Sequence, residues 1–126
     1  MRYLLDTTVL IDHARGHDGA VRLVATLFEN PNDLYTCDVI VTEALTGGDD
    51  EERATINTLI RALEYVSTPP DAAVWAAESR RSRRSLGPRG LADALVAGLA
   101  WTLRAIVVTR NPKDFERQGV PVLAYE

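Results

Sequence analysis

The segment Met1-Arg-Tyr-Leu-Leu-Asp-Thr-Thr-Val-Leu-Ile-Asp12 contains the features around which the rest of the chain is arranged. Its apolar run, Tyr3–Leu5, is too short for a helix and predicts a buried strand. Asp6 ends this run, and Thr7–Thr8 can cap a helix that starts at Val9. Ligands of open parallel sheets bind beyond the carboxyl ends of the strands, which is where Asp6 would stand. Asp6 therefore has two interpretations, a simple helix N-cap or a member of a functional site.

Outward from this stretch, short apolar strands alternate with helices. Helical spacing of apolar residues predicts helices over 20–28, 39–45, 49–63 and 91–103, and from 71 into the arginines that begin at 80. Further strands are expected over 34–37, 65–67, 105–108 and 121–124, the last at an edge of the sheet, with a turn over 111–119. This alternation is typical of an α/β fold with a parallel central sheet of four to five short strands flanked by helices. A length of 126 residues predicts a single domain, 1–126.

Composition narrows the class of protein. The chain is 46% hydrophobic and 25% charged, as expected of a folded globular protein. No apolar run approaches the length of a membrane span, and the first strand leaves no room for a signal peptide, so we expect a cytoplasmic protein with no membrane partner. Cys37 is the single cysteine, which excludes an intramolecular disulfide. The net charge of −4 argues against a nucleic-acid packing protein.

Acidic residues stand in surroundings that do not favour them. Asp6 follows the first strand, Glu43 lies within an apolar helix, and Asp93 is flanked by alanines near the start of the most apolar helix. Asp114, and Asn111 as a neutral relative, follow the strand that ends at 108, at the same edge as Asp6. Carboxylates that converge on one edge repel each other unless a cation neutralises them. A ligand set of oxygens, without His or Cys, indicates a hard ion, Mg²⁺ or Mn²⁺.

Four motifs that contain these acids resemble those of the PIN domain, and most of all those of the VapC toxins of type II toxin–antitoxin pairs. The motifs are Leu4-Leu-Asp-Thr-Thr8, Val41-Thr-Glu-Ala-Leu45, Leu91-Ala-Asp-Ala-Leu95 and Val108-Thr-Arg-Asn-Pro-Lys-Asp-Phe115. They cover the whole chain in order, and four motifs in register are far more specific than one. The resemblance implies a PIN fold with the first strand in the middle of the sheet. It also implies a Mg²⁺-dependent endoribonuclease that uses metal-activated water to leave 5′-phosphate and 3′-hydroxyl ends.

The resemblance also assigns roles to individual residues. Asp6, Glu43 and Asp93 match the three acidic positions, and Asp6 and Asp93 would hold the Mg²⁺, for which Mn²⁺ can substitute. Glu43 would orient or deprotonate the attacking water. Many PIN domains have an acid directly after Thr-Arg, where this chain has Asn111, so either Asn111 or Asp114 completes the site, with one metal ion or two. The supporting residues would be Thr8, which matches the small polar position after the first Asp, Thr109 and Asn111.

RNA contacts are expected from arginines, because thirteen of the fourteen basic residues are arginine. Five of them lie within ten residues: Arg80, Arg81, Arg83, Arg84 and Arg89. These five are either phosphate contacts or a solvated helix face, with equal weight, and Arg110 beside the proposed site is the better single candidate. The sequence offers no aromatic stacking platform typical of single-strand readers. His13 and His17 are expected to be solvated, which gives little support to a ribonuclease that uses paired histidines.

Other classes of function fit less well. Phosphatases of the haloacid dehalogenase type need a second Asp two residues after the first, where this chain has Thr8. Receiver domains need a Lys after a late strand, and Lys113 lies beyond Asn111-Pro112. The remaining alternative is a PIN scaffold that binds RNA or protein without cutting.

The resemblance also predicts partners. It implies a cognate antitoxin that keeps the enzyme inactive, a homodimer, and a heterotetramer or larger complex with the antitoxin. The support for the homodimer from the sequence itself is modest: Trp75 and Trp101 are large apolar residues in a small domain, and one of them can serve an interface. We expect a basic antitoxin side chain among the acids, and apolar antitoxin residues in a groove formed by 9–28 and 39–45.

Overall fold

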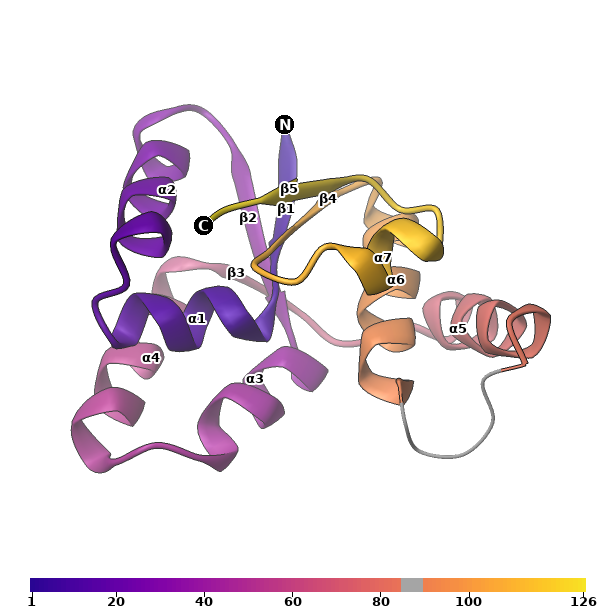
Figure 1. Ribbon diagram of the computed structural model, residues 1–126, viewed down its shortest axis with the longest axis horizontal. Coiled ribbons are helices and arrows are strands. Elements are labelled where there is room, and N and C mark those ends of the chain that lie inside the picture. The colour runs from indigo at the N-terminus through magenta and orange to yellow at the C-terminus, as the bar shows by residue number, and fades with distance from the viewer. Residues whose placement is uncertain (85–89) are drawn as a thin grey trace.

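A computed structural model describes residues 1–84 and 90–126 (Figure 1). The strands are β1 (Arg2–Leu5), β2 (Asp33–Cys37), β3 (Glu64–Val66), β4 (Ile106–Thr109) and β5 (Val122–Ala124). The helices are α1 (Thr7–Ala14), α2 (Asp18–Glu29), α3 (Asp38–Thr46), α4 (Asp50–Ala62), α5 (Pro70–Ser82), α6 (Leu91–Leu103) and α7 (Lys113–Arg117). None of these helices is long and apolar enough to cross a membrane.

The five strands form one all-parallel sheet in the order β3-β2-β1-β4-β5. The expected parallel sheet with β1 in the middle is therefore confirmed. Helices lie on both sides of it, with α1, α2 and α4 on one side and α5 and α6 on the other (Figure 1). β5 is at one edge, as expected, and β3 is at the other. All five strands point the same way, so their carboxyl ends meet at one edge, which α3 and the first turns of α1 and α6 flank (Figure 1).

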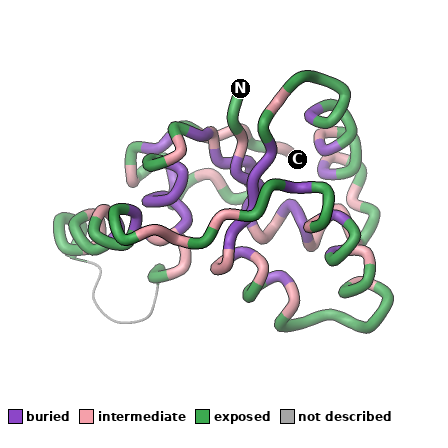
Figure 2. The backbone as a smooth tube through the Cα atoms, turned by 180° about the vertical axis from the view of Figure 1, so that it is seen from behind, coloured by how far each residue is buried: buried purple, intermediate pink, exposed green. Residues whose placement is uncertain are grey.

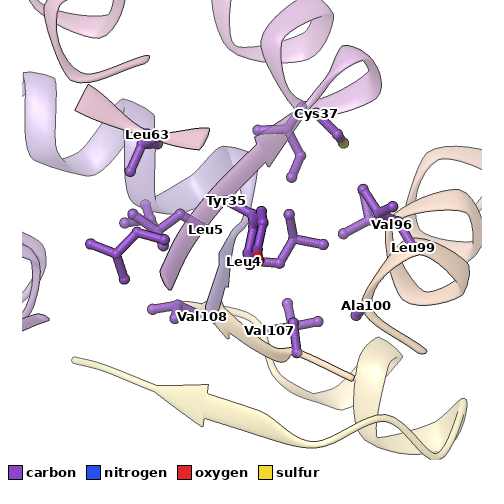
Figure 3. Packing of buried hydrophobic residues seen from close by; sticks show 14 of the residues in the cluster. Leu4, Leu5, Tyr35, Cys37, Leu63, Val96, Leu99, Ala100, Val107 and Val108 are labelled. Carbon is purple, nitrogen blue, oxygen red and sulfur yellow. The ribbon is translucent and has the colours of Figure 1, made fainter. Parts of the chain in front are cut away.

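The core lies against the middle strands, whose tube is mostly buried in Figure 2. β1 and β4 pair side by side, with Leu5 opposite Val108, and both residues are fully buried. α6 packs against them from one side through Val96 and Leu99 (Figure 3). Burying each such side chain stabilises the fold by about 1.5–3 kcal/mol relative to exposure. The apolar residues that predicted buried strands thus hold the carboxyl ends of β1 and β4 in fixed positions.

Two local expectations were wrong. The predicted turn over 111–119 contains α7, whose five residues are too few to show a helical period. Its existence follows from Pro112, which already has helical backbone angles, and from Phe115, which is buried in the core. The sequence also predicts a break between helices at Gly16 and Gly19; the chain does break between α1 and α2, over 15–17, but Gly19 lies inside α2, which begins at Asp18. There the backbone carbonyl of Glu126 occupies the space that a Cβ would need.

Gly98 allows the close packing of α5 on α6, and this contact gives the first prediction. A Cβ at Gly98 would collide with the backbone carbonyl of Ala72, which cannot rotate away as a flexible side chain could. Gly98→Ala gains up to about 1 kcal/mol of helix propensity, but we expect a net loss of roughly 1–3 kcal/mol in the free energy of unfolding. Urea denaturation measures it. Gly47→Ala is the control, since no atom lies within 4 Å of a Cβ there; equal effects of the two substitutions would contradict the packing argument.

Candidate active site

Asp6 lies at the carboxyl end of β1, between the middle strand and the start of α1. Its backbone N–H donates to the carbonyl of Val108 at 3.0 Å, which extends the pairing of β1 with β4 by one residue. The side chain is only 5% exposed, and the Thr109 hydroxyl donates to its Oδ2 at 3.0 Å. Asp6 occupies the N-cap position of α1, but its side chain makes no capping hydrogen bond. The carboxylate therefore faces β4, and capping does not account for its burial.

Burial raises the pKa of Asp6 to about 6. Hydrogen bonds from the backbone of Thr7 and from the hydroxyl of Thr109 act in the opposite direction, and the nearby charge of Glu43 raises the pKa further. A carboxylate whose charge is this disfavoured is a candidate for binding a cation.

Thr109 and Thr8 hold the end of β4 against the start of α1. Their hydroxyls lie 3.3 Å apart, and the N–H of Arg110 donates to the Thr8 hydroxyl at 3.1 Å. The N–H of Asn111 donates to the Thr109 hydroxyl, also at 3.1 Å. One buried hydroxyl, that of Thr109, thus donates to Asp6 and accepts from the following loop. Both threonines lie where the motifs led us to expect supporting residues.

Thr109→Val tests this network. Valine keeps the shape of the side chain, but it removes the donor to Asp6 and leaves the N–H of Asn111 without its acceptor. We expect the free energy of unfolding to fall by about 1–3 kcal/mol, the usual cost of unsatisfied buried polar groups. Thermal and urea unfolding measure it. Thr109→Ser is the control, because it restores the hydroxyl; a serine variant as unstable as the valine variant would show that the methyl group, and not the network, supplies the stability.

Asp93 lies in the first turn of α6, where it is half-buried. α6 begins after Gly90, whose φ of 78° is a backbone conformation that glycine adopts readily. Burial raises the pKa of Asp93 to about 6, and the charges of Asp6, Asp114 and Glu43, in that order, raise it further. The four acids that the sequence singled out are therefore close enough to repel each other.

Glu43 and Asp114 lie close to this pair, since their charges contribute to its raised pKa values. Glu43 projects from α3, is exposed, and accepts a hydrogen bond from the Thr7 hydroxyl at 2.8 Å. Asp114 lies on α7, close enough to Asp93 to raise the pKa of that carboxyl. Asp93 and Asp114 both line a cavity of about 500 Å³. Asn111 is exposed and is not among the residues that line it. The geometry thus brings Asp114, and not the side chain of Asn111, to the acidic cluster.

The acidic cluster, defined as Asp6, Glu43, Asp93 and Asp114, has the chemistry of a Mg²⁺ site. Its donors are all carboxylate oxygens, and their mutual repulsion is relieved by a divalent cation. Within residues 1–84 and 90–126, no three acidic, His or Cys side chains are already gathered at ligating distance. Mg²⁺ does not require this, because it keeps several waters and is usually held by one or two carboxylates. Asp6, which is buried, and Asp93, which is half-buried, are the two least exposed members and fit that role.

The five arginines at 80, 81, 83, 84 and 89 do not all lie at this cavity. Arg80 and Arg83 line the same cavity as Asp93 and Asp114, and Arg117 of α7, which the sequence analysis missed, lines it with them. Arg81 and Arg84 are exposed and are not among the residues that line it, and Arg89 lies outside the described residues. Arg117 could have been noticed from its position, since it stands three residues after Asp114 and lies 3.7 Å from it.

Arg110 projects from the loop after β4 and forms an ion pair with Asp12. Its guanidinium lies 3.3 Å from the carboxylate of Asp12, which also accepts a hydrogen bond from the Tyr125 hydroxyl at 2.8 Å. Its charge is thus partly neutralised, and its role in RNA binding stays a prediction. Neither Asp12 nor Tyr125 was singled out in the sequence, because only the fold brings them together.

The expectation that His13 and His17 are solvated was wrong. Both are half-buried, and burial lowers the pKa of His13. His17 packs its ring against that of Tyr125, with the ring centroids 5.9 Å apart. Neither side chain is therefore fully exposed to solvent.

The chain is similar to known proteins in family, sequence and fold. The family model for the PIN domain matches residues 3–120. Ribonuclease VapC19 of Mycobacterium tuberculosis is 30% identical over 114 residues, which are 89% of this chain and 90% of that protein.

Two solved structures illustrate the likeness in fold. The VapBC2 complex of Rickettsia felis, bound to a DNA fragment from its promoter, superposes with a TM-score of 0.82 at 19% identity and covers 100% of both chains. Mycobacterium tuberculosis VapC20, a toxin that cleaves the sarcin–ricin loop, superposes with a TM-score of 0.72 at 18% identity and covers 94% of this chain and 95% of that one. At these identities the two structures show the fold alone.

Proposed function

The chain belongs to the PIN domain family, and on this basis we propose that it is a Mg²⁺-dependent endoribonuclease, the toxin of a toxin–antitoxin pair. The observation that carries the proposal is the acidic cluster at the carboxyl edge of the sheet, where Asp6 and Asp93 both have a pKa raised to about 6. The relative VapC19 is named a ribonuclease, which supports the same activity.

The residues of the acidic cluster would have different roles in the reaction. Asp6 and Asp93 would hold the cation, and Asp114, which lines the cavity with Asp93, completes the negative edge. A bound divalent cation supplies polarisation of the scissile phosphodiester and neutralises the charge of the leaving oxygen. Glu43 is exposed and keeps the hydroxyl of Thr7 as a partner, so it can orient water or accept its proton. The hydroxyl of Thr109, which donates to Asp6, would hold this carboxylate in position.

The test is the integrity of RNA incubated with the purified protein. We expect fragments in Mg²⁺ or Mn²⁺ and intact RNA in EDTA. The alternative, a PIN scaffold that binds RNA or protein without cutting, predicts intact RNA under both conditions and retained binding.

We also propose that an antitoxin controls the enzyme, in a complex built on a homodimer. The Rickettsia felis relative is itself a toxin–antitoxin complex, and the acidic cluster is an attractive site for a basic side chain. An apolar depression of about 310 Å³ between α3 and α6 borders Glu43, and Val21 and Phe28 are exposed apolar residues on α2. Trp101, 57% exposed and stacked on Trp75, is available for an interface between copies.

The antitoxin proposal predicts which substitutions weaken inhibition. If a basic antitoxin side chain enters the acidic cluster, Asp6→Asn weakens antitoxin binding by about tenfold or more, the usual cost of losing a charged partner. Charge reversal at Arg83 and Arg84 leaves it unchanged. Titration calorimetry with the antitoxin encoded beside this chain measures both. The opposite result would place the inhibitory contact on the arginines.

A further inference from the structure

We infer that a groove between α5 and α7 binds the single-stranded RNA that flanks the cleaved bond. The groove, called the arginine groove below, is lined by Arg80, Arg83, Arg117, Gln118 and Trp75. This inference rests on the proposed function, because it names the substrate-binding surface of that same site.

The first observation is that the arginine groove starts at the acidic cluster. Arg80, Arg83 and Arg117 line the cavity of about 500 Å³ that Asp93 and Asp114 also line. A phosphodiester that approaches carboxylates alone would be repelled. The three arginines in the same lining, of which Arg117 lies 3.7 Å from Asp114, offset this repulsion and offer planar donors that suit phosphate oxygens. A cavity lined by both carboxylates and guanidinium groups fits an anionic ligand that binds the same cation as the carboxylates.

The second observation is that the arginine groove continues away from the acids. A second cavity, of about 390 Å³, shares Arg83, Arg117 and Gln118 with the first and extends to Trp75. Gln118 joins the two helices, since its side chain accepts from the Ser79 hydroxyl at 3.1 Å and donates to the carbonyl of Asp114 at 3.0 Å. The walls of the groove are thus fixed to each other. Glu78 also lines the second cavity, where the two arginines outnumber it.

The third observation is an aromatic residue at the far end. Trp75 is half-buried and stacks on Trp101, with ring centroids 6.3 Å apart, which holds its indole in place. An aromatic ring next to phosphate-binding cations is the combination that single-strand binders use, because an unpaired base can stack on the ring while its phosphate meets the cations. A duplex keeps its bases stacked on each other and cannot use Trp75 in this way.

The experiment measures RNA binding apart from cleavage. The parent is the full-length Asp6→Asn variant in EDTA, and the probe is a short, fluorescein-labelled, single-stranded RNA of mixed sequence, followed by anisotropy. Each of Arg83→Gln and Arg117→Gln should weaken binding about five- to tenfold and lower the slope of log K against log salt by roughly 0.7, as expected for one lost phosphate contact. Trp75→Ala should weaken binding roughly tenfold without changing that slope, and Trp75→Phe should restore most of it.

Matched variants distinguish RNA binding in the arginine groove from non-specific attraction of RNA to any arginine. Arg61→Gln, on α4, should bind as the parent does, and thermal melting checks that each variant is folded. The inference is overturned if Arg81→Gln weakens binding as much as Arg83→Gln, if the groove variants bind like the parent, if a duplex of the same sequence binds more tightly, or if the parent does not bind. Cleavage of the same RNA by the wild type in Mg²⁺ is scored separately. Cleavage with unaffected groove variants would overturn the groove alone, and groove-dependent binding without cleavage would overturn the nuclease alone.

Discussion

Asp6→Asn and Asp93→Asn are each expected to lower the rate of RNA cleavage at least about a thousandfold, which corresponds to the several kcal/mol that a catalytic cation contributes to a transition state. Both substitutions keep the size of the side chain, and each removes one carboxylate of the acidic cluster. Asn at position 6 can still accept the hydrogen bond from Thr109, so the local structure should persist. Single-turnover cleavage of a labelled RNA in saturating Mg²⁺ measures the loss.

Asp33→Asn is the matched control. Asp33 is the first residue of β2, so it lies at the amino ends of the strands, away from the acidic cluster, and its side chain is exposed. It should cleave at the wild-type rate. Wild-type activity in either cluster variant, freed of contaminating nuclease, would refute the assignment of the site. Unfolding of both cluster variants would instead favour a purely structural role for these acids.

The same two substitutions should stabilise the protein when no metal is present. The folded state raises the pKa of Asp6 from 3.8 to about 6, so the carboxyl binds its proton more tightly in the folded than in the unfolded chain. A difference of one pKa unit between the folded and unfolded chain corresponds to about 1.4 kcal/mol. Ionised Asp6 therefore lowers the free energy of unfolding by on the order of 2–3 kcal/mol. This cost is absent below about pH 3.8 and complete above about pH 6. Asp93 is half-buried, and solvent reduces its cost to about 1 kcal/mol.

Urea denaturation in EDTA therefore has a predicted pH dependence. At pH 8 the free energy of unfolding of Asp6→Asn should exceed that of the wild type by about 2 kcal/mol, and the difference should vanish as the pH falls from about 6 toward 4. Mg²⁺ should stabilise the wild type at pH 8 and leave the Asp6→Asn, Asp93→Asn double variant unchanged. A variant less stable than the wild type at pH 8, or stabilised by Mg²⁺ to the same extent, would contradict the repulsion among the acids.

Local patterns were enough to predict the elements that position the acidic cluster. The apolar run Tyr3–Leu5 and the β-branched residues before Thr109 are strands because both faces of a middle strand are buried, and such strands need no alternation. The range expected for the last long helix, 91–103, is that of α6. Asp6 and Asp93 could be singled out because a carboxylate next to apolar residues is costly without a partner.

Features that depend on packing between distant segments could not be predicted in this way. The sequence groups Arg80, Arg81, Arg83 and Arg84, but only the packing of α5 beside α6 and α7 decides that Arg80 and Arg83 line the cavity of Asp93. The choice between Asn111 and Asp114 likewise depends on α7, whose single turn carries no period. The pairing of Asp12 with Tyr125 joins residues 113 positions apart, a separation at which no local pattern carries information.

The chemistry of the RNA ends distinguishes hydrolysis at a cation site from attack by the ribose 2′-hydroxyl. If the acidic cluster is a cation-dependent hydrolytic site, a 5′-labelled RNA cut by the purified protein in Mg²⁺ gives fragments with 3′-hydroxyl ends, and the downstream fragments carry 5′-phosphates. Cleavage stops in EDTA and returns with added Mg²⁺ or Mn²⁺. Fragments with 2′,3′-cyclic phosphates and 5′-hydroxyls, formed equally well in EDTA, would contradict it, because they arise from attack by the ribose 2′-hydroxyl and require no cation at Asp6 and Asp93.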